Sequence, residues 1–187
     1  MDRIVLDIET SNTFADVGGE RNLTALCVSL IGAYSYNRNE YISFTEHTLA
    51  EFGPILQKAG LVIGFAIDRF DLPVLAKHYS FNVMSLNRLD LLEEFELATG
   101  HRISLNTLAK INLGQEKTGH GLEAVKLYKE GKIDELRSYC LQDVKLTKDL
   151  YDLAKKQGYL MYPHKITGQW ERATMKFADD FLPATLF

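Results

Sequence analysis

The sequence predicts an α/β fold, with a mixed sheet of five strands flanked by helices and a hairpin-like C-terminal appendage. The chain has 187 residues, a length that favours one domain around a single sizeable core. Hydrophobic residues make up 46% and charged residues 25%, which excludes a disordered chain. Strand-like runs with a hairpin come first, helices and strands then alternate, and helices follow, an order typical of α/β domains.

Most of the expected strands lie in the first half of the chain. Residues 4–9 form an apolar run in which acids alternate at the far end, as in a strand. Strands are also expected at 26–36 and 41–45, because residues 37–40 have the composition of a hairpin turn. The next expected elements are a helix from the N-cap Thr48 to Gly60, a buried strand at 61–65, a helix at 72–79 and a fifth strand at 82–86.

Helices dominate the second half. The periodicity predicts helices at 89–99, 105–113, 122–130 and 133–157, each followed by a glycine. Residues 159–162 and 169–172 flank a segment with Pro163 and Gly168, which predicts a hairpin outside the main domain. We therefore expect a domain over residues 1–157 and a C-terminal extension over 158–187 that packs on the same domain.

Composition excludes several classes of protein. The apolar runs are too short for a membrane span, and the N-terminus lacks the features of a signal peptide. Cys27 and Cys140 are too few for a disulfide scaffold, so we expect reduced thiols and a cytoplasmic protein. Residues 1–100 carry 7 basic and 14 acidic side chains, and residues 101–187 carry 14 basic and 11 acidic ones. This asymmetry fits either a phosphate-binding face beside an acidic metal site or a solvated surface without a partner.

Four carboxylates stand at positions that a purely structural chain would rarely use. Asp7 and Glu9 share one face of the first strand at its C-terminal end, where α/β sheets place ligand sites. Asp71 follows the next buried strand after a short loop, although alone it also fits a helix N-cap. Asp143 lies within the apolar stripe of the longest helix, where a carboxylate is costly unless a cation pairs with it. Tyr139 lies one turn earlier on the same face, a place that also suits an ordinary core tyrosine.

These acids predict a metal centre if they converge. Four negative charges cannot gather without compensation, and two divalent cations would balance them. Carboxylate and water ligands select hard ions, so Mg²⁺ or Mn²⁺ is expected rather than zinc. Two such ions about 4 Å apart promote in-line cleavage of phosphodiesters.

Three segments resemble the motifs of a known family. Residues 7–10 (Asp-Ile-Glu-Thr) are similar to the first exonuclease motif of the DEDD superfamily of 3′–5′ exonucleases, and residues 64–73 resemble the second. Residues 139–143 (Tyr-Cys-Leu-Gln-Asp) resemble the third motif in the form that defines the tyrosine (DEDDy) branch. The other branch has histidine where this chain has Ser138. The likeness spans residues 3–155 and implies a ribonuclease H-like, DnaQ-like fold. It also implies metal-dependent 3′–5′ digestion of single-stranded nucleic acid, with DNA slightly favoured over RNA.

The resemblance also implies catalytic roles for the matching residues. Asp7 would bridge two Mg²⁺ or Mn²⁺ ions, Glu9 and Asp143 would hold the ion that carries the attacking water, and Asp71 would serve the second ion. Tyr139 would orient the water through its hydroxyl, because a phenol is a poor general base at neutral pH.

Substrate contacts are assigned to Thr10, Phe70 and Lys117, the last as a phosphate contact. Phe70 equally fits a plug of the core, since aromatic residues mostly serve cores. The chain departs from the family at Ala66, where its members usually carry asparagine five residues before Asp71. Alanine has no side-chain group to hydrogen-bond a loop or a nucleotide, which weakens the expected grip on substrate.

Two other functions remain open. The chain would be a catalytically weakened module that binds nucleic acid or a partner, or a structure-selective endonuclease with the same chemistry. The complete set of acids favours an enzyme over the module. In the C-terminal extension, Tyr159, Tyr162 and Trp170 are amphipathic anchors for a partner protein or for self-association, unless the extension packs on its own domain.

Overall fold

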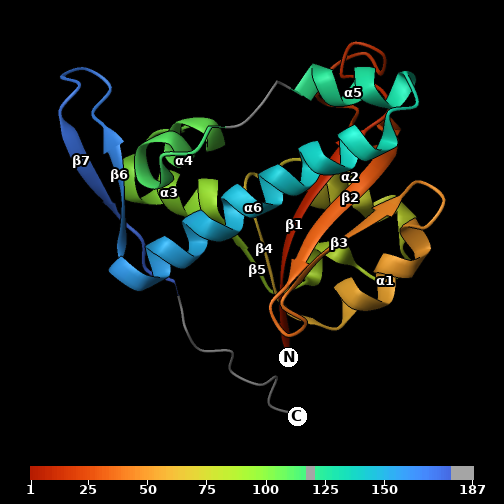
Figure 1. Cartoon of the computed structure of the whole chain (residues 1–187), viewed down its shortest axis with the longest axis horizontal. Helices are drawn as coiled ribbons and strands as arrows, with labels where there is room; N and C mark the ends of the chain where they lie inside the picture. Colours follow the sequence, from red (N-terminus) through yellow and green to blue (C-terminus); the bar gives the residue numbers. More distant parts are fainter. Residues whose placement is uncertain (117–120, 178–187) are drawn as a thin grey trace.

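The computed structural model describes residues 1–116 and 121–177 (Figure 1). Its central sheet has the strand order β3-β2-β1-β4-β5. The strands are β1 (Asp2–Thr10), β2 (Val28–Ser35), β3 (Glu40–Thr45), β4 (Ala59–Gly64) and β5 (Arg88–Asp90). The pairs β1–β2 and β2–β3 are antiparallel, whereas β1–β4 and β4–β5 are parallel. The predicted α/β class and the mixed five-stranded sheet are therefore confirmed.

Helices cover both faces of this sheet (Figure 1). They are α1 (Leu49–Gln57), α2 (Asp71–Leu75), α3 (Leu91–Thr99), α4 (Leu105–Leu113), α5 (Gly121–Lys129) and α6 (Ile133–Gln157). Short 3₁₀ turns occupy Leu23–Ala25, Ala76–His78 and Val83–Ser85. Within the described residues, no helix has both the length and the apolar character needed to cross a membrane.

Two expected element positions are wrong. The segment predicted as the fifth strand holds the 3₁₀ turn Val83–Ser85, because the Asn82 side chain accepts a hydrogen bond from the Met84 amide at 3.0 Å. Such local bonds compete with strand pairing, and the fifth strand forms later, at Arg88–Asp90. Gly60 does not end a helix but lies within β4, where a Cβ atom would stand 2.5 Å from Met1 Cβ.

The alternation of β1 fixes which side of the sheet carries the acids. Ile4, Leu6 and Ile8 enter the core that includes α1 and α2. Val5 points to the opposite face and enters the core that includes α6. Because side chains alternate along a strand, Asp7 and Glu9 continue the direction of Val5 and face α6.

α6 approaches the sheet closely at Gly32, which pairs with Asp7 in the β1–β2 register. A Cβ atom at Gly32 would lie 2.7 Å from Cys140 Sγ and 3.1 Å from Val144 Cγ2. Only glycine leaves room for these side chains, so α6 packs close to the sheet and Cys140 lies beside Asp7.

The C-terminal hairpin forms as predicted, with β6 (Tyr159–Pro163) antiparallel to β7 (Trp170–Thr174). It projects beside α3 and α4 (Figure 1). The Asn112 side chain bonds both backbone groups of Met161, at 2.8 and 2.9 Å. Tyr162 packs edge-on against Phe95, with 5.3 Å between ring centroids. The base of the hairpin thus shares the core that contains α6, while Trp170 is 63% exposed.

Candidate metal centre

Three side chains with metal-ligating atoms meet at the C-terminal end of β1. One such atom from each of Asp7, Glu9 and Cys140 lies within 4.8 Å of the others. The Cys140 thiol donates a hydrogen bond to Asp7 Oδ2 at 3.5 Å. Glu9 and Cys140 are buried, and Asp7 is half-buried. Two carboxylates and a thiol held this close form a donor set that can hold a divalent cation.

Asp71 reaches the same place from the neighbouring edge of β1. The pairing of β1 with β4 stops at Val5, and Ile8 lies beyond it. The Ile8 amide donates a hydrogen bond to Asp71 Oδ1 at 3.0 Å. Asp71 is the first residue of α2 and Phe70 is the N-cap, so Asp71 does not cap this helix. Its carboxyl is instead fixed against the strand residue between Asp7 and Glu9.

The buried position of Asp71 has an electrostatic consequence. Burial raises the pKa of this carboxyl to about 7, and the hydrogen bond from Ile8 opposes that rise. The negative charges of Asp90 and Asp143 raise the pKa further. The folded protein therefore disfavours the ionised form of the Asp71 carboxyl.

Asp143 lies one turn after Cys140 on α6 and is 3% exposed. Burial raises the pKa of the Cys140 thiol well above its usual value, and the charges of Asp7, Glu9 and Asp143 add to this rise. The thiol is thus neutral, and it shares its surroundings with three of the predicted acids. The charge of Asp143 also raises the pKa of Asp71, so Asp143 is close enough to act on both Cys140 and Asp71.

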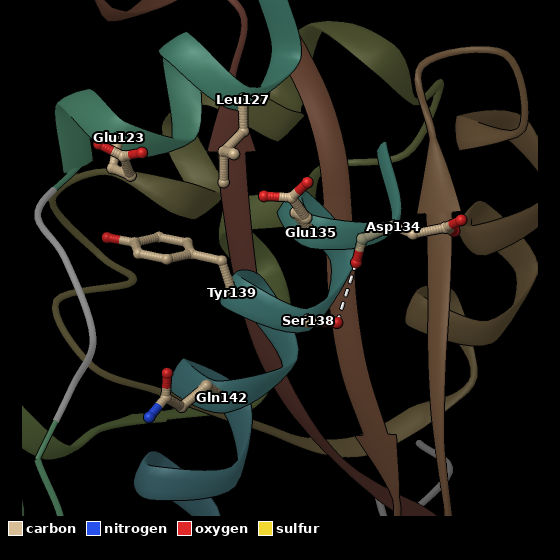
Figure 2. A pocket seen from close by; sticks show the side chains of 7 residues that line it. All are labelled: Glu123, Leu127, Asp134, Glu135, Ser138, Tyr139 and Gln142. Atoms are coloured by element: carbon tan, nitrogen blue, oxygen red, sulfur yellow. Dashed lines mark hydrogen bonds between the residues drawn. The ribbon is translucent and has the colours of Figure 1, made fainter. Parts of the chain in front are cut away.

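Tyr139 lies one turn before Asp143 and faces α5. Its side chain packs with Leu30, Ala124 and Leu127, and its hydroxyl oxygen is buried. Figure 2 shows the ring pointing from α6 toward Glu123 of α5. Tyr139 lines a cavity of about 630 Å³ together with Glu123, Leu127, Asp134, Glu135, Ser138 and Gln142.

A second cavity, of about 450 Å³, is lined by Glu9 and by both predicted substrate contacts that the structure describes, Thr10 and Phe70. The Phe70 ring meets that of Phe14 edge-on, with 5.8 Å between centroids. The remaining lining residues are Asn12, Thr13, Ala15 and Leu26, with Leu122 and Val125 of α5. Phe70 also packs on the core that includes α1 and α2. Lys117 lies outside the described residues.

Comparison with known families decides the superfamily. The profile of the RNase H superfamily matches residues 4–155. The chain belongs to the RNase H superfamily. No curated protein is similar enough in sequence to match this RNase H chain.

Among solved structures, the RNase H chain is similar to the family B DNA polymerase from the hyperthermophilic archaeon Pyrobaculum calidifontis. The TM-score is 0.59 at 15% sequence identity. The match covers 83% of this chain and 24% of the polymerase chain, so this chain spans about a quarter of the length of that protein. This likeness supports the ribonuclease H-like fold.

Asp90, which is 4% exposed in the RNase H fold, is a further buried acid that the sequence did not single out. Asp90 caps α3 and also accepts hydrogen bonds from the amides of Ala66 and Asp68, at 2.8 and 3.1 Å. Its position directly before an apolar helical run is a signal for an N-cap. Its second set of bonds depends on the path of a distant loop, for which the sequence holds no local signal.

Ala66 has a left-handed backbone conformation, with a φ of 66°. Alanine is strained there, whereas asparagine, usual at this position in the DEDD family, tolerates it better. Ala66→Gly is therefore expected to raise the free energy of unfolding by about 1 kcal/mol, measured by urea denaturation. Ala76→Gly is the matched control. Ala76 has a right-handed helical backbone conformation, so glycine at this position should lower the free energy of unfolding. Equal destabilisation by both changes would contradict the strain at Ala66.

Proposed function

We propose that this RNase H superfamily member is a metal-dependent 3′–5′ exonuclease of the tyrosine branch. It hydrolyses phosphodiester bonds of single-stranded nucleic acid, with DNA favoured over RNA. The observation that carries the proposal is the meeting of Asp7 and Glu9 at the end of β1, with Asp71 bonded to the Ile8 amide between them. The buried Asp143 of α6 adds a charge that affects both Asp71 and the neighbouring Cys140. Buried acids gathered in this way oppose folding unless cations neutralise them, and the raised pKa of Asp71 is a sign of that cost.

The donor set fits two Mg²⁺ or Mn²⁺ ions. Asp7, Glu9 and Asp143 would hold one ion, and Asp7 with Asp71 would hold the other, because carboxylate oxygens prefer hard cations. Such ions supply charge stabilisation and an activated water at neutral pH. Of the three neighbouring groups, the carboxylates of Asp7 and Glu9 rather than the Cys140 thiol would be the ligands, because hard cations prefer oxygen to sulfur.

The 450 Å³ cavity beside Glu9 suits a terminal nucleotide. Its aromatic wall, Phe14 and Phe70, offers ring faces and edges on which a base can stack. Stacking does not require a particular base, since every base has a π-face. The cavity therefore supports binding of an unpaired 3′ end.

Digestion is expected to be nearly independent of base identity. The Thr10 hydroxyl donates to Asn12 O at 2.8 Å. The Asn12 side chain donates from Nδ2 to Ala25 O and accepts at Oδ1 from the Cys27 amide. The Thr13 hydroxyl bonds Asp16. These lining groups already have partners, so they are poorly placed to read base edges. Single-turnover rates on short dA, dC and dT oligomers should differ by less than about tenfold, the discrimination that one hydrogen bond provides. A larger preference for one base would contradict this account of the cavity.

Tyr139→Phe tests the water-orienting role of the tyrosine. The variant keeps the ring that packs against α5 and loses only the hydroxyl, so Mn²⁺ affinity should be unchanged. The single-turnover rate should fall by about 100-fold, the scale for misplacing a reacting group. Tyr128→Phe is the control, because it removes a hydroxyl that bonds Glu46 away from the acids. Parallel losses of metal binding and rate would refute the positioning role.

The decisive experiment is digestion of 3′- and 5′-labelled single-stranded DNA and RNA with Mg²⁺ or Mn²⁺. A 3′–5′ exonuclease releases mononucleotides from the 3′ end and leaves circular strands intact. Cleavage of circles would identify an endonuclease. Absence of both digestion and Mn²⁺-dependent stabilisation would favour the binding module.

Two further predictions concern association and location. One is association with a partner protein, or with a second copy, through the C-terminal extension. The exposed Trp170 is the side chain to change, with oligomer size measured by sedimentation. The other is the cytoplasmic location expected from the sequence.

A further inference from the structure

Asp90 is a buried carboxylate with four backbone amides around it. Its Oδ1 accepts from Leu92 and Glu93 of α3, at 2.9 and 3.4 Å, as an N-cap does. The same Oδ1 accepts from Ala66 at 2.8 Å, and Oδ2 accepts from Asp68 at 3.1 Å. One carboxylate therefore ties the first turn of α3 to the loop that follows β4.

The loop at residues 65–70 is held in a specific shape. The left-handed conformation of Ala66 accompanies the bond from its amide to Asp90. Asp68 is also fixed by an ion pair with Arg88, whose guanidinium donates to Met84 O at 2.7 Å. The loop ends at Phe70 and leads directly into Asp71.

This loop carries a proposed metal ligand into place. Asp71 Oδ1 receives the Ile8 amide of β1, beside Asp7 and Glu9. Asp90 adds a negative charge to a region that is already acidic, and this charge opposes ionisation of Asp71. Capping α3 does not require that cost, because serine or asparagine caps helices equally well. The bonds to the loop distinguish aspartate, since only a carboxylate offers two acceptor oxygens without a donor.

We infer that Asp90 is a positioning residue of the proposed metal centre, which holds Asp71 against β1 by fastening the loop at residues 65–70 to the start of α3. The inference rests on the proposed function for its consequence, but its structural content does not depend on a bound metal. Asp90 would act through the Ala66 and Asp68 amides, which donate hydrogen bonds to its carboxylate.

The test uses Asp90→Ser in the full chain. Serine keeps the helix cap but is too short to hold the loop. Hydrogen exchange of the Ile8 amide in the metal-free protein should accelerate by roughly tenfold or more, because its acceptor Asp71 is released locally. The Mn²⁺ dissociation constant, measured by calorimetry, should rise by about 10–100-fold, the usual effect of removing an outer-sphere partner. Ser104→Ala is the matched control, since it removes a helix cap at α4 and leaves the loop intact.

Asp90→Asn is the second variant if Asp90→Ser does not fold. Asparagine caps helices well and keeps one acceptor oxygen, but its NH₂ group cannot accept a hydrogen bond from a backbone amide of the loop. A smaller acceleration of Ile8 exchange is then expected. Wild-type exchange of the Ile8 amide in a folded Asp90 variant would overturn the inference even if the protein digests DNA. If the proposed function is wrong, the wild-type protein will neither bind Mn²⁺ nor digest DNA. The exchange rate of the Ile8 amide would still decide the role of Asp90 in that case.

Discussion

Asp7→Asn is expected to lower the rate of phosphodiester hydrolysis by several orders of magnitude while the protein stays folded. Asp7 is the proposed ligand of both ions, so its loss removes the shared anchor of the centre. It faces α6 beside Cys140, and Glu9 lies within 4.8 Å. Asparagine has nearly the same shape but lacks the charge, so the packing between β1 and α6 is preserved.

The folded state gives this prediction its control. Asp7→Asn removes one charge from a repulsive group, so the metal-free variant should unfold at the same temperature as the wild type or above it. Asp149→Asn changes a carboxylate of α6 that pairs with Lys145 at 2.6 Å, outside the acid cluster, and should retain activity. An Asp7→Asn protein that digests DNA at a rate comparable with the wild type would contradict the proposed centre.

Local periodicity was sufficient to predict much of the candidate site. Alternation along β1 places Asp7 and Glu9 on one face, and the helical stripe of α6 places Asp143 on the buried side. Both predictions depend on single elements, whose geometry is fixed by backbone repeat lengths alone. This is why the sequence alone predicts that the acids of β1 and the buried acid of α6 point toward one another.

Contacts between elements were not predictable in the same way. Cys140 lies beside Asp7 because Gly32, in a third element, lets α6 pack low on the sheet. Asp90 joins the start of α3 to a loop more than 20 residues earlier in the chain. No pattern within a window of sequence encodes such pairs, because they depend on how finished elements dock.

The misplaced fifth strand has a different cause. Residues 82–86 have strand-like composition, but the Asn82 side chain accepts a hydrogen bond from the Met84 amide, and such local bonds compete with strand pairing. The strand then forms at Arg88–Asp90, where its parallel register with β4 brings Asp90 opposite Gly64. Asp90 thereby reaches the loop that follows β4.

Asp71 should make the metal-free protein less stable as the pH rises from about 4 to about 7. Burial raises the pKa of this carboxyl from 3.8 to about 7 in the folded state, whereas the unfolded chain ionises near the ordinary value. Between these two values the folded state holds a proton that the unfolded state has lost. Stability therefore falls with increasing pH, by about 1.4 kcal/mol for each unit of pKa difference. The effect is complete once the pH exceeds the pKa in the folded state.

Asp71→Asn isolates this contribution. The amide oxygen can still accept the Ile8 hydrogen bond, but the variant has no carboxylate to ionise. In urea denaturation with a chelator, the variant should exceed the wild type in stability at pH 8 and approach it at pH 4. Mn²⁺ should reverse this order at pH 8, because the wild type can bind both ions whereas the variant has lost a ligand of the second one. Asp134→Asn, at an exposed carboxylate of α6, should follow the wild-type profile throughout. Parallel pH profiles for wild type and Asp71→Asn would mean that the Asp71 carboxyl is already ionised without a cation, which would contradict the cost assigned to burying this carboxyl.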